Sequence, residues 1–424
     1  MEVLKPLIVS HNLDGGAGGA AYRLHEGLRG RGVDSQLLVQ FDSQGTEGIH
    51  TVARDPVTRR LAWRRGLVDR LPVRAYPDRE RPHSLWPLWL PDPLVSRRVR
   101  ELDPTVVNLH WVLDALVSIE MVPRLPPPLV WTMHDMWPFT GGCDYSLGCE
   151  RFTEACGACP VVRSDAPRDL SRWIWRRKRR AWSRLELTAV APSRWLAGCA
   201  RRSSLFRDRR VEVIPNGIDT TTFKPVDRSA SRSLLNLPAE ARLVMFGAHD
   251  DTPRKGLREL TAALRALAGA GGTRDLEALL VGPSTIAEYA ELPLRVHVRG
   301  PFGDEVSMAA AYSSADVLVL PSLWDNLPAV GLEALACGTP VVGFGGDSGV
   351  PDIVDHRSNG YLARALDVDD LARGIDWVIG EGERSEALRV AARQKAEREY
   401  TLDLCARRYE RLFEEVVAQT RATT

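Results

Sequence analysis

The chain has 424 residues, of which 44% are hydrophobic and 26% are charged, and this composition is typical of a globular protein. The formal net charge of +1 argues against a general nucleic-acid binder, so we expect no nucleic-acid partner. No apolar run approaches the ~20 residues of a membrane-spanning helix, and the segment Met1 to Ser10 resembles a strand rather than a signal peptide, which indicates a cytoplasmic protein. At about 150 residues per domain, the length allows two or three domains.

The first half of the chain alternates short apolar runs with helical segments, a pattern typical of a doubly wound α/β domain with a parallel sheet. Between about residues 50 and 100 this pattern breaks into a mixture of arginine, tryptophan and proline, which predicts an insertion. The runs that predict strands are 7–10, 36–39, 106–109, 129–132, 187–190 and 211–214.

The first predicted strand runs directly into a glycine-rich turn over residues 11–23. Glycines let the backbone approach a ligand, and the helix that begins there has free amides suited to a phosphate. Any tight strand-to-helix connection satisfies the same pattern, so the turn alone is a weak indication. The candidate residues are Gly15, Gly16, Gly18 and Gly19.

Two histidines follow neighbouring predicted strands. His134 comes after the strand that ends at Thr132, and His110 comes after the strand that ends at Leu109. Ligands of parallel sheets bind at the carboxyl ends of strands, where a histidine can donate to a sugar hydroxyl. Most lone histidines are structural, and His110 is the weaker candidate of the two.

Four of the seven cysteines lie close together in the sequence, at Cys143, Cys149, Cys156 and Cys159. Four thiolates can enclose a tetrahedral zinc ion, although this spacing is not that of a standard zinc finger. Four reduced thiols are the alternative, because a cytosolic chain is not expected to carry a disulfide framework. A closed four-thiolate site has no open position, so such a zinc would be structural.

A basic segment over residues 172–184 combines arginines with tryptophans and predicts a helix. It is either a solvated face whose arginine stems cover tryptophan or a docking surface for an anionic membrane or a lipid diphosphate.

After a polar stretch that ends near residue 237, the alternation restarts and predicts a second Rossmann-like domain. Arg254 and Lys255 lie at the start of a helix in this half, where the helix dipole disfavours a basic pair unless it is solvated or has an anionic partner. A diphosphate leaving group would be such a partner. The predicted strands are 243–246, 278–281, 296–298, 317–320 and 341–344.

Two carboxylates follow the strand 317–320. Asp325 lies at its carboxyl end, and Glu333 lies about one and a half turns into a helix predicted over roughly 328–337. Carboxylates accept hydrogen bonds from vicinal hydroxyls, and amides at a helix start favour phosphate, so these groups suit a nucleotide sugar. A capping aspartate and a solvated glutamate would account for the pair equally well. The Asp367-Val-Asp369 pair is interpreted as a helix cap rather than a metal motif.

The stretch 321–340 resembles the nucleotide-sugar signature of family 4 glycosyltransferases, with Asp325 in place of the first of two glutamates. The run 131–143 is similar to that of bacterial exopolysaccharide glycosyltransferases of the colanic-acid type. The resemblance implies the GT-B fold, in which two Rossmann-like domains face a central cleft. It also implies retaining transfer of a hexosyl group from a nucleoside-diphosphate sugar to a saccharide, lipid-linked or natural-product acceptor, without a catalytic metal.

Roles follow from the resemblance residue by residue. Glu333 is expected to hold the ribose hydroxyls, while Asp325, with the amides of Asn326 and Leu327, meets the donor hexose. Proline at position 328 stands where the family often has glycine. His134 is expected to position the hexose together with Asp325.

The remaining roles concern the diphosphate. Arg254 and Lys255 are expected to offset the charge of the leaving group, and the glycine-rich turn of the first domain is expected to face the donor diphosphate. A nucleotide-sugar 2-epimerase and a catalytically silent nucleotide-sugar-binding subunit are the alternatives that share this fold.

The resemblance also predicts the domain organisation. Residues 1–214 form the acceptor-side domain, with the insertion at about 50–100 and the cysteine cluster at 143–159, and residues 215–398 form the nucleotide-sugar domain. Residues 399–424 form a helix that crosses back to the first domain. We expect peripheral contact with the inner face of the cell membrane.

Overall fold

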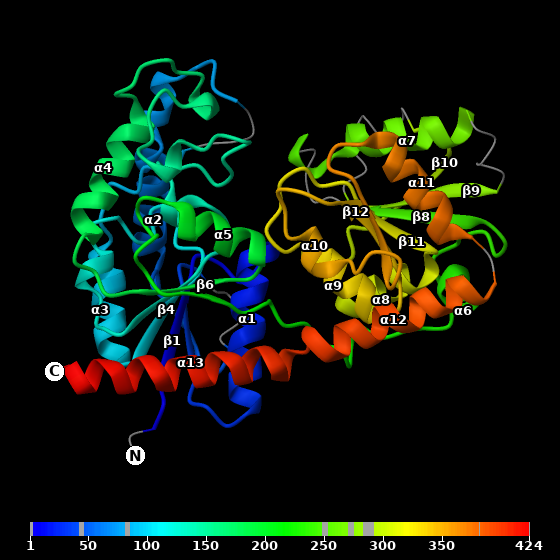
Figure 1. Cartoon of the computed structure of the whole chain (residues 1–424). Helices are drawn as coiled ribbons and strands as arrows, with labels where there is room; N and C mark the ends of the chain where they lie inside the picture. Colours follow the sequence, from blue (N-terminus) through cyan, green and yellow to red (C-terminus); the bar gives the residue numbers. More distant parts are fainter. Residues whose placement is uncertain are drawn as a thin grey trace. The chain divides into compact units, whose positions relative to one another are not determined.

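The computed structural model describes residues 3–41, 46–80, 85–247, 253–269, 275–282, 292–380 and 382–423. The chain divides into two compact units, drawn in Figure 1. The first unit comprises Met1–Gly217 together with Asp403–Thr424, and the second comprises Ile218–Leu402.

The first unit is built on a parallel sheet with the strand order β3-β2-β1-β4-β5-β6-β7 across its described residues. Its central strands are buried on both faces, which explains why they appear in the sequence as continuous apolar runs. The strands are β1 Pro6–Ser10, β2 Gln36–Val39, β3 Ile49–Thr51, β4 Val106–Leu109, β5 Leu129–Thr132, β6 Thr188–Ala191 and β7 Val211–Val213.

Two helices of this unit lie largely within the segment 50–100, where the alternation of apolar runs and helical segments breaks in the sequence. Helix α2 (Pro56–Asp69) begins at a capping box in which the Asp55 side chain accepts hydrogen bonds from the amides of Val57 and Thr58. Its apolar residues do not gather on one face, so a search for helical periodicity misses it. The other helices are α1 Gly15–Gly30, α3 Pro93–Leu102, α4 Leu170–Trp182, α5 Arg194–Arg202 and α13 Leu402–Thr423.

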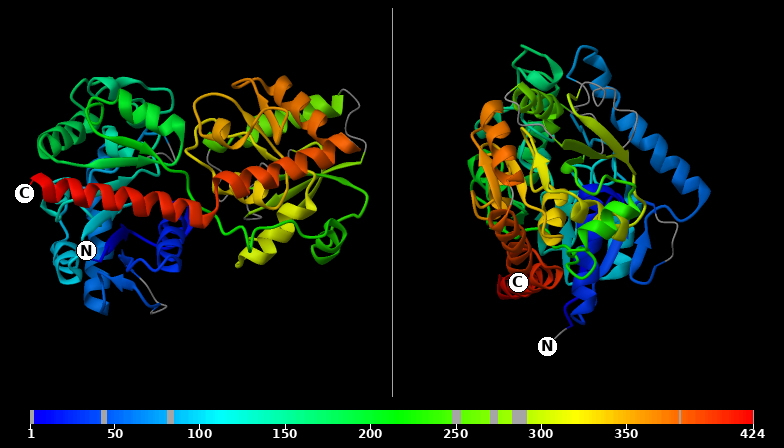
Figure 2. Two further views of the ribbon diagram at one scale, coloured as in Figure 1. Left: turned by 60° about the horizontal axis from the view of Figure 1, so that its bottom comes forward. Right: turned by 90° about the vertical axis from the view of Figure 1, so that its right-hand side faces the viewer.

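Helix α13 packs on the first unit, as Figure 2 shows for the helix drawn in red. Tyr409 and Phe413 of α13 share a core with Ile8 of β1 and Leu24 of α1. The Tyr409 hydroxyl also lies 2.9 Å from the hydroxyl of Thr132, at the end of β5. The last helix of the chain therefore completes the core of the first unit.

The second unit has a parallel sheet with the strand order β10-β9-β8-β11-β12-β13 across its described residues, and buried clusters cover both faces. Its strands are β8 Arg242–Gly247, β9 Leu276–Val281, β10 Arg295–Arg299, β11 Val317–Leu320, β12 Val341–Phe344 and β13 Gly360–Ala363. Its helices are α6 Arg228–Leu234, α7 Leu257–Gly269, α8 Glu305–Ser314, α9 Ala329–Ala336, α10 Val350–Ile353, α11 Val368–Ile379 and α12 Glu383–Glu399.

Two strands were not predicted. Strand β3 has three half-buried residues at the sheet edge, and β13 begins with a glycine, so neither forms an apolar run. The interpretation of Asp367 as a helix cap is confirmed, because its side chain accepts from the Asp370 amide at the start of α11. Within the described part of the chain, no helix combines the length and the apolar character needed to cross a membrane.

Candidate functional site

In the second unit, Asp325 lies between β11 and α9 and is the centre of a buried charge cluster. Its carboxylate accepts a hydrogen bond from Lys255 Nζ at 2.6 Å, and Arg254 Nη1 lies 3.6 Å from the same oxygen. Burial of the carboxyl raises its pKa, but the charges of Lys255 and Arg254, together with the hydrogen bonds from Lys255 and the Asn326 amide, lower it by more, so the pKa of Asp325 lies below its ordinary value. Asp325 is therefore an ionised carboxylate at neutral pH.

A short turn brings the two cations to this carboxylate. Arg254 and Lys255 belong to the 3-10 helix η6 (Pro253–Lys255), whose Arg254 carbonyl accepts from the Leu323 amide at 2.8 Å. Gly256 follows with φ of +76°, and a Cβ atom there would lie 1.9 Å from the carbonyl oxygen of Pro321. Only glycine permits this approach. In the sequence, Gly256 could be selected only because it directly follows Arg254 and Lys255.

Glu333 lies on α9 and is half-buried. Its Oε2 accepts a hydrogen bond from the hydroxyl of Tyr312 at 2.9 Å, and Tyr312 is fully buried on α8. Burial and the charge of Glu333 raise the pKa of the neighbouring Cys337 thiol to about 12. The tyrosine fixes the orientation of the carboxylate, and sequence reasoning missed it because Tyr312 lies on another helix.

The backbone amides in the loop before α9 are less available to a ligand than the sequence predicted. The Asn326 amide donates to the Asp325 carboxylate at 3.0 Å, so it is not free in this structure. Leu327 is buried in the apolar core of the unit. The Asp325 carbonyl accepts from the Gly349 amide at 2.9 Å, which ties this loop to the glycine-rich turn after β12.

In the first unit, His110 and His134 follow the neighbouring strands β4 and β5 and contact each other. His110 Nδ1 lies 2.9 Å from His134 Nε2, at hydrogen-bond distance. Burial lowers the pKa of His134 to about 4, and burial followed by the proximity of His134 lowers the pKa of His110 well below its ordinary value. Both rings are therefore neutral at pH 7, and one donates to the other. His110, the weaker candidate in the sequence, is thus paired with the stronger one.

Asp135 is a further titratable group beside this pair that sequence reasoning did not select. It is buried and accepts a hydrogen bond from the Trp137 amide at 2.8 Å. Burial, followed by the charge of Asp144, raises the pKa of Asp135 to about 7. Its carboxyl group therefore titrates near neutral pH.

The four candidate glycines lie in the first part of α1, which begins at Gly15. A Cβ atom on Gly18 would lie 2.7 Å from the carbonyl oxygen of Asn12, so Gly18 is needed for packing within the turn. Gly15 and Gly16 have no heavy atom within 4 Å of an added Cβ, and Gly19 has open space to nearly the same extent. Gly15, Gly16 and Gly19 are therefore the glycines that leave room beside the backbone.

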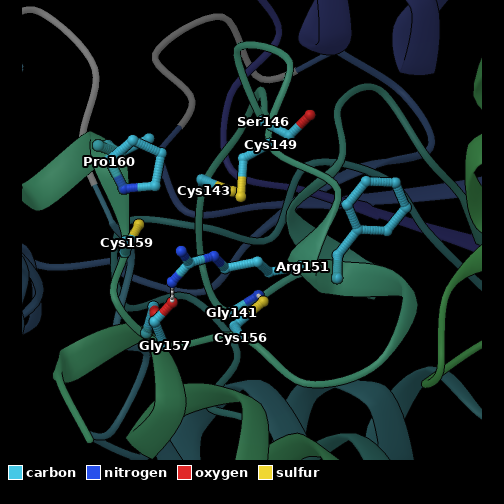
Figure 3. Close-up of a pocket in the computed structure, with 12 residues that line it drawn as sticks. Gly141, Cys143, Ser146, Cys149, Arg151, Cys156, Gly157, Cys159 and Pro160 are labelled. Atoms are coloured by element: carbon cyan, nitrogen blue, oxygen red, sulfur yellow. Dashed lines mark hydrogen bonds between the residues drawn. The ribbon is translucent and has the colours of Figure 1, made fainter. Parts of the chain in front are cut away.

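The four clustered cysteines line one cavity between β5 and α4, shown in Figure 3. All four are free thiols; Cys143, Cys156 and Cys159 are buried, and Cys149 is half-buried. The side chain of Arg151 extends among them and donates to the carbonyls of Gly157 and Ala158 at 2.8 Å. Within the described residues, no three His, Cys, Asp or Glu side chains are placed to hold a metal ion, so the predicted zinc tetrahedron is not assembled in this geometry.

More of the tryptophan side chains of the basic helix α4 are buried than we expected. Trp175 and Trp182 are buried, and Trp173 is 42% exposed, with the Arg177 guanidinium 4.5 Å from its ring centroid. Arg177 also forms an ion pair with Glu120 at 2.6 Å. Much of this helix is therefore a packed and paired surface.

The comparison with known families covers both units. Residues 14–222 match the family described as Glycosyltransferase Family 4, and residues 240–381 match the family described as Glycosyl transferases group 1. The chain belongs to the group 1 and family 4 glycosyltransferases. The predicted family is thereby confirmed.

A curated relative from this family is the D-inositol 3-phosphate glycosyltransferase of Mycobacterium marinum, which is 31% identical over 178 residues, 40% of this chain and 37% of the relative. The same protein of Mycobacterium tuberculosis strain H37Ra is 31% identical over 198 residues, 44% of this chain and 40% of the relative. The chain thus spans well under half the length of the curated relatives it matches.

Solved structures resemble the whole chain in fold. The sucrose-phosphate synthase of Thermosynechococcus elongatus has a TM-score of 0.68 at 19% identity and covers 99% of this chain and 100% of its own. Anabaena HepE in complex with UDP and glucose has a TM-score of 0.66 at 18% identity and covers 97% of this chain and 100% of its own. These are GT-B proteins, so the predicted GT-B fold with two Rossmann-like domains is confirmed.

Proposed function

We propose that the chain is a retaining glycosyltransferase that moves a hexosyl group from a nucleoside-diphosphate sugar to an acceptor hydroxyl without a catalytic metal. The observation that carries the proposal is the charge cluster of the second unit, where Arg254 and Lys255 meet the buried carboxylate of Asp325. A buried carboxylate with two cations in a family of nucleotide-sugar enzymes suits a diphosphate beside a polyol. The tyrosine-oriented Glu333 on α9 adds a second acceptor for hydroxyl groups.

In this proposal each group acts on a different part of the donor. Arg254 and Lys255 neutralise the diphosphate as its bond to the anomeric carbon breaks, which is where negative charge grows. Glu333 accepts hydrogen bonds from the ribose hydroxyls, and Asp325 from a hydroxyl of the hexose. Lys255 is held by Asp325 in this structure, so donor binding would share that cation between carboxylate and phosphate.

The proton balance of the transfer needs no strong protein base. The acceptor oxygen bonds to the anomeric carbon on the face that the diphosphate leaves, and the acceptor proton passes to an oxygen of the departing diphosphate. His134, which is neutral at pH 7 because burial lowers its pKa, serves as a hydrogen-bond donor to a hexose hydroxyl. Its pairing with His110 fixes the orientation of the ring.

The decisive experiment measures donor cleavage and product stereochemistry. A thermal-shift screen of nucleoside diphosphates identifies the base, beginning with UDP because HepE was solved with it. Release of the diphosphate is then followed with saccharide acceptors, and with inositol phosphate because the mycobacterial relatives are named for it. The product anomer is read by NMR, with chelator present in one arm.

Each alternative gives a different result in these assays. Retention of the anomeric configuration with unchanged rate in chelator supports the proposal. Inversion, or a loss of rate in chelator while the metal content and melting temperature of the protein stay unchanged, contradicts it. Binding of nucleotide without hydrolysis or transfer from any donor would indicate a silent binding subunit. Conversion of the donor without an acceptor would indicate an epimerase.

We also propose that the first unit contacts anionic membrane through α2 while the enzyme acts on a lipid-linked acceptor in exopolysaccharide synthesis. Val57 and Leu61, which are four residues apart and therefore lie on the same side of this helix, are 67% and 55% exposed. Exposed arginines at positions 60 and 64 flank these two residues and complement anionic headgroups. This surface is more exposed than the tryptophans of α4.

Sedimentation with vesicles tests this surface against α4. We expect binding to phosphatidylglycerol vesicles but not to phosphatidylcholine vesicles, and loss of most binding in the variant Val57→Ala/Leu61→Ala. The matched control is Trp173→Ala on α4, which should bind as the wild type does. Binding that depends on Trp173 instead, or no dependence on anionic lipid, would contradict the proposal.

A further inference from the structure

The four-cysteine cavity lies in a segment that has little regular structure to hold it. Between β5 and α4 the described chain contains short 3-10 helices, η3 Trp137–Phe139, η4 Arg151–Thr153 and η5 Pro160–Val162. An isolated bridge joins Cys143 to Leu85. Segments of this kind need cross-links or buried apolar surface to stay folded.

Backbone amides point at two of the four sulfur atoms. The Gly141 amide donates to Cys156 Sγ at 3.1 Å. The amides of Val161 and Val162, in the turn that follows Cys159, are hydrogen-bonded to the sulfur of Cys159. A neutral thiol is a weak acceptor, whereas a metal-bound thiolate carries negative charge and uses such donors. The turn after Cys159 therefore already presents the donors that a metal-bound thiolate would use.

Two basic side chains, Lys178 and Arg151, lie near the four cysteines as well. The Lys178 side chain is fully buried and lies close enough to Cys143 and Cys156 for their charges to interact. Its ammonium group donates to the carbonyls of Trp137 and Thr140 and lies 3.4 Å from the ring centroid of Trp137. Carbonyls and a ring satisfy its donors; burial lowers the pKa of Lys178 well below its ordinary value, and the charges of Cys143, Cys156 and Asp135 oppose that shift.

We propose that Cys143, Cys149, Cys156 and Cys159 bind one zinc ion as four thiolates that clamp the segment between β5 and α4. A zinc ion with four thiolates has a formal charge of about −2, from +2 for the metal and −1 for each sulfur. Lys178, which lies near Cys143 and Cys156, and Arg151, once it has turned out of the space among the sulfurs, are the basic side chains that can supply the opposite charge. Each thiol proton is released to solvent when its sulfur binds the metal.

Binding requires a defined rearrangement of the cavity. The sulfur atoms must draw together around the ion, and the guanidinium of Arg151 must leave the space among them. Arg151 is an exposed residue, so its side chain can turn toward solvent and stay near the cluster. Four sulfur ligands in tetrahedral geometry select zinc or an iron–sulfur cluster, and these are distinguished by iron content and colour.

The clamp lies next to the histidine pair without being part of it. The Met136 amide donates to the Asp144 carbonyl at 2.7 Å, which ties the segment after His134 to the residue after Cys143. We therefore expect metal removal to lower the stability of the first unit. The proposal does not depend on the transferase assignment, because its readout is metal content.

The test uses the full-length protein purified without metal-affinity resin and analysed by elemental mass spectrometry. We expect about one zinc per chain, and a lower melting temperature after treatment with a strong chelator. Cys149→Ser and Cys159→Ser should each lose most of the zinc. The matched control is Cys199→Ser, a buried cysteine on α5 outside the cavity, which should keep it.

Three results would overturn the proposal. Zinc below about a tenth of an equivalent, with all seven cysteines titrating as free thiols in denaturant, would mean four reduced thiols. Fewer free thiols in denaturant without metal would mean disulfides, and stoichiometric iron with visible colour would mean an iron–sulfur cluster. The metal content of the wild-type protein tests the proposal even if a cysteine variant fails to fold.

Discussion

Replacing Lys255 with methionine removes the cation that contacts the buried carboxylate of Asp325 while keeping the apolar stem. Removing one partner of a buried ion pair destabilises a protein by about 3–5 kcal/mol. Two features reduce that figure here: the Lys255 side chain is 24% exposed, and Arg254 remains 3.6 Å from the same carboxylate oxygen. We therefore expect the free energy of unfolding to fall by about 1–3 kcal/mol.

A double-mutant cycle measures this interaction by urea unfolding of the wild type, Lys255→Met, Asp325→Asn and the double variant. Because the two side chains touch, we expect a coupling free energy of about 1–2 kcal/mol. The matched control is Lys224→Met, an exposed lysine of the same unit, which should change stability by less than about 0.5 kcal/mol. Additive losses in the double variant would refute the reasoning.

The pH dependence gives an independent check on Lys255→Met. In the wild type the pKa of Asp325 is lowered, so the stabilisation by its cations is present above the ordinary carboxyl pKa of about 4 and is lost as the pH falls through the folded-state pKa. In the variant the carboxyl stays buried with less compensation, so its pKa rises and protonation near pH 5 relieves part of the loss. The stability gap should narrow from about pH 7 to about pH 5, and a constant gap would contradict this account.

Three further predictions concern other residues of the two units. His134→Gln should lower turnover by about 100-fold. The wild type loses up to about 3 kcal/mol of stability as the pH falls from 6.5, the pKa of histidine in the unfolded chain, to about 4, the pKa of His134 in the folded protein, and the variant should not show this loss. Glu333→Gln should weaken nucleotide binding by about 10–100-fold in calorimetry, and Tyr312→Phe by less, because it only orients that carboxylate. Gly256→Ala should destabilise the second unit by about 1–3 kcal/mol in thermal or urea unfolding, because the added methyl meets a backbone carbonyl and φ is positive.

Control variants and contrasting results distinguish these effects from a general loss of stability. Gly303→Ala is the control for Gly256, because an added Cβ at Gly303 meets no heavy atom within 4 Å. Equal stability of Gly256→Ala and Gly303→Ala would contradict the packing argument. Unchanged nucleotide affinity in Glu333→Gln would remove the ribose role, and an unchanged stability profile in His134→Gln would mean that its ring is not buried in neutral form.

The parallel sheets could be predicted because their strands are buried on both faces and so appear as apolar runs. The runs at 106–109 and 129–132 match β4 and β5, whereas β3 and β13 lack such a run. Helix α2 escaped detection for a related reason, since its exposed apolar residues give no helical periodicity. Its signal was instead local, in the cap at Asp55 followed by a proline.

The candidate site residues could be selected one by one from the sequence, but the contacts among them could not be predicted. Position at a strand end selected Asp325 and His134, since topology alone places such residues at a sheet edge. The partners came from elsewhere in the chain: Lys255 reaches Asp325 from across 70 positions, and Tyr312 orients Glu333 from another helix. Such pairings depend on side-chain packing, which no local pattern encodes.

The position of α13 in the core of the first unit constrains the order in which the chain can mature on the ribosome. The ends of the second unit are joined by hydrogen bonds from the Ile218 amide to the Tyr400 carbonyl and from the Leu402 amide to the Ile218 carbonyl. That unit is therefore complete once residue 402 has emerged. The first unit, although synthesised earlier, must wait for Tyr409 and Phe413 to close its core. During translation the N-terminal half is thus the later of the two to finish folding, and it is the half whose apolar surface a chaperone would need to shield.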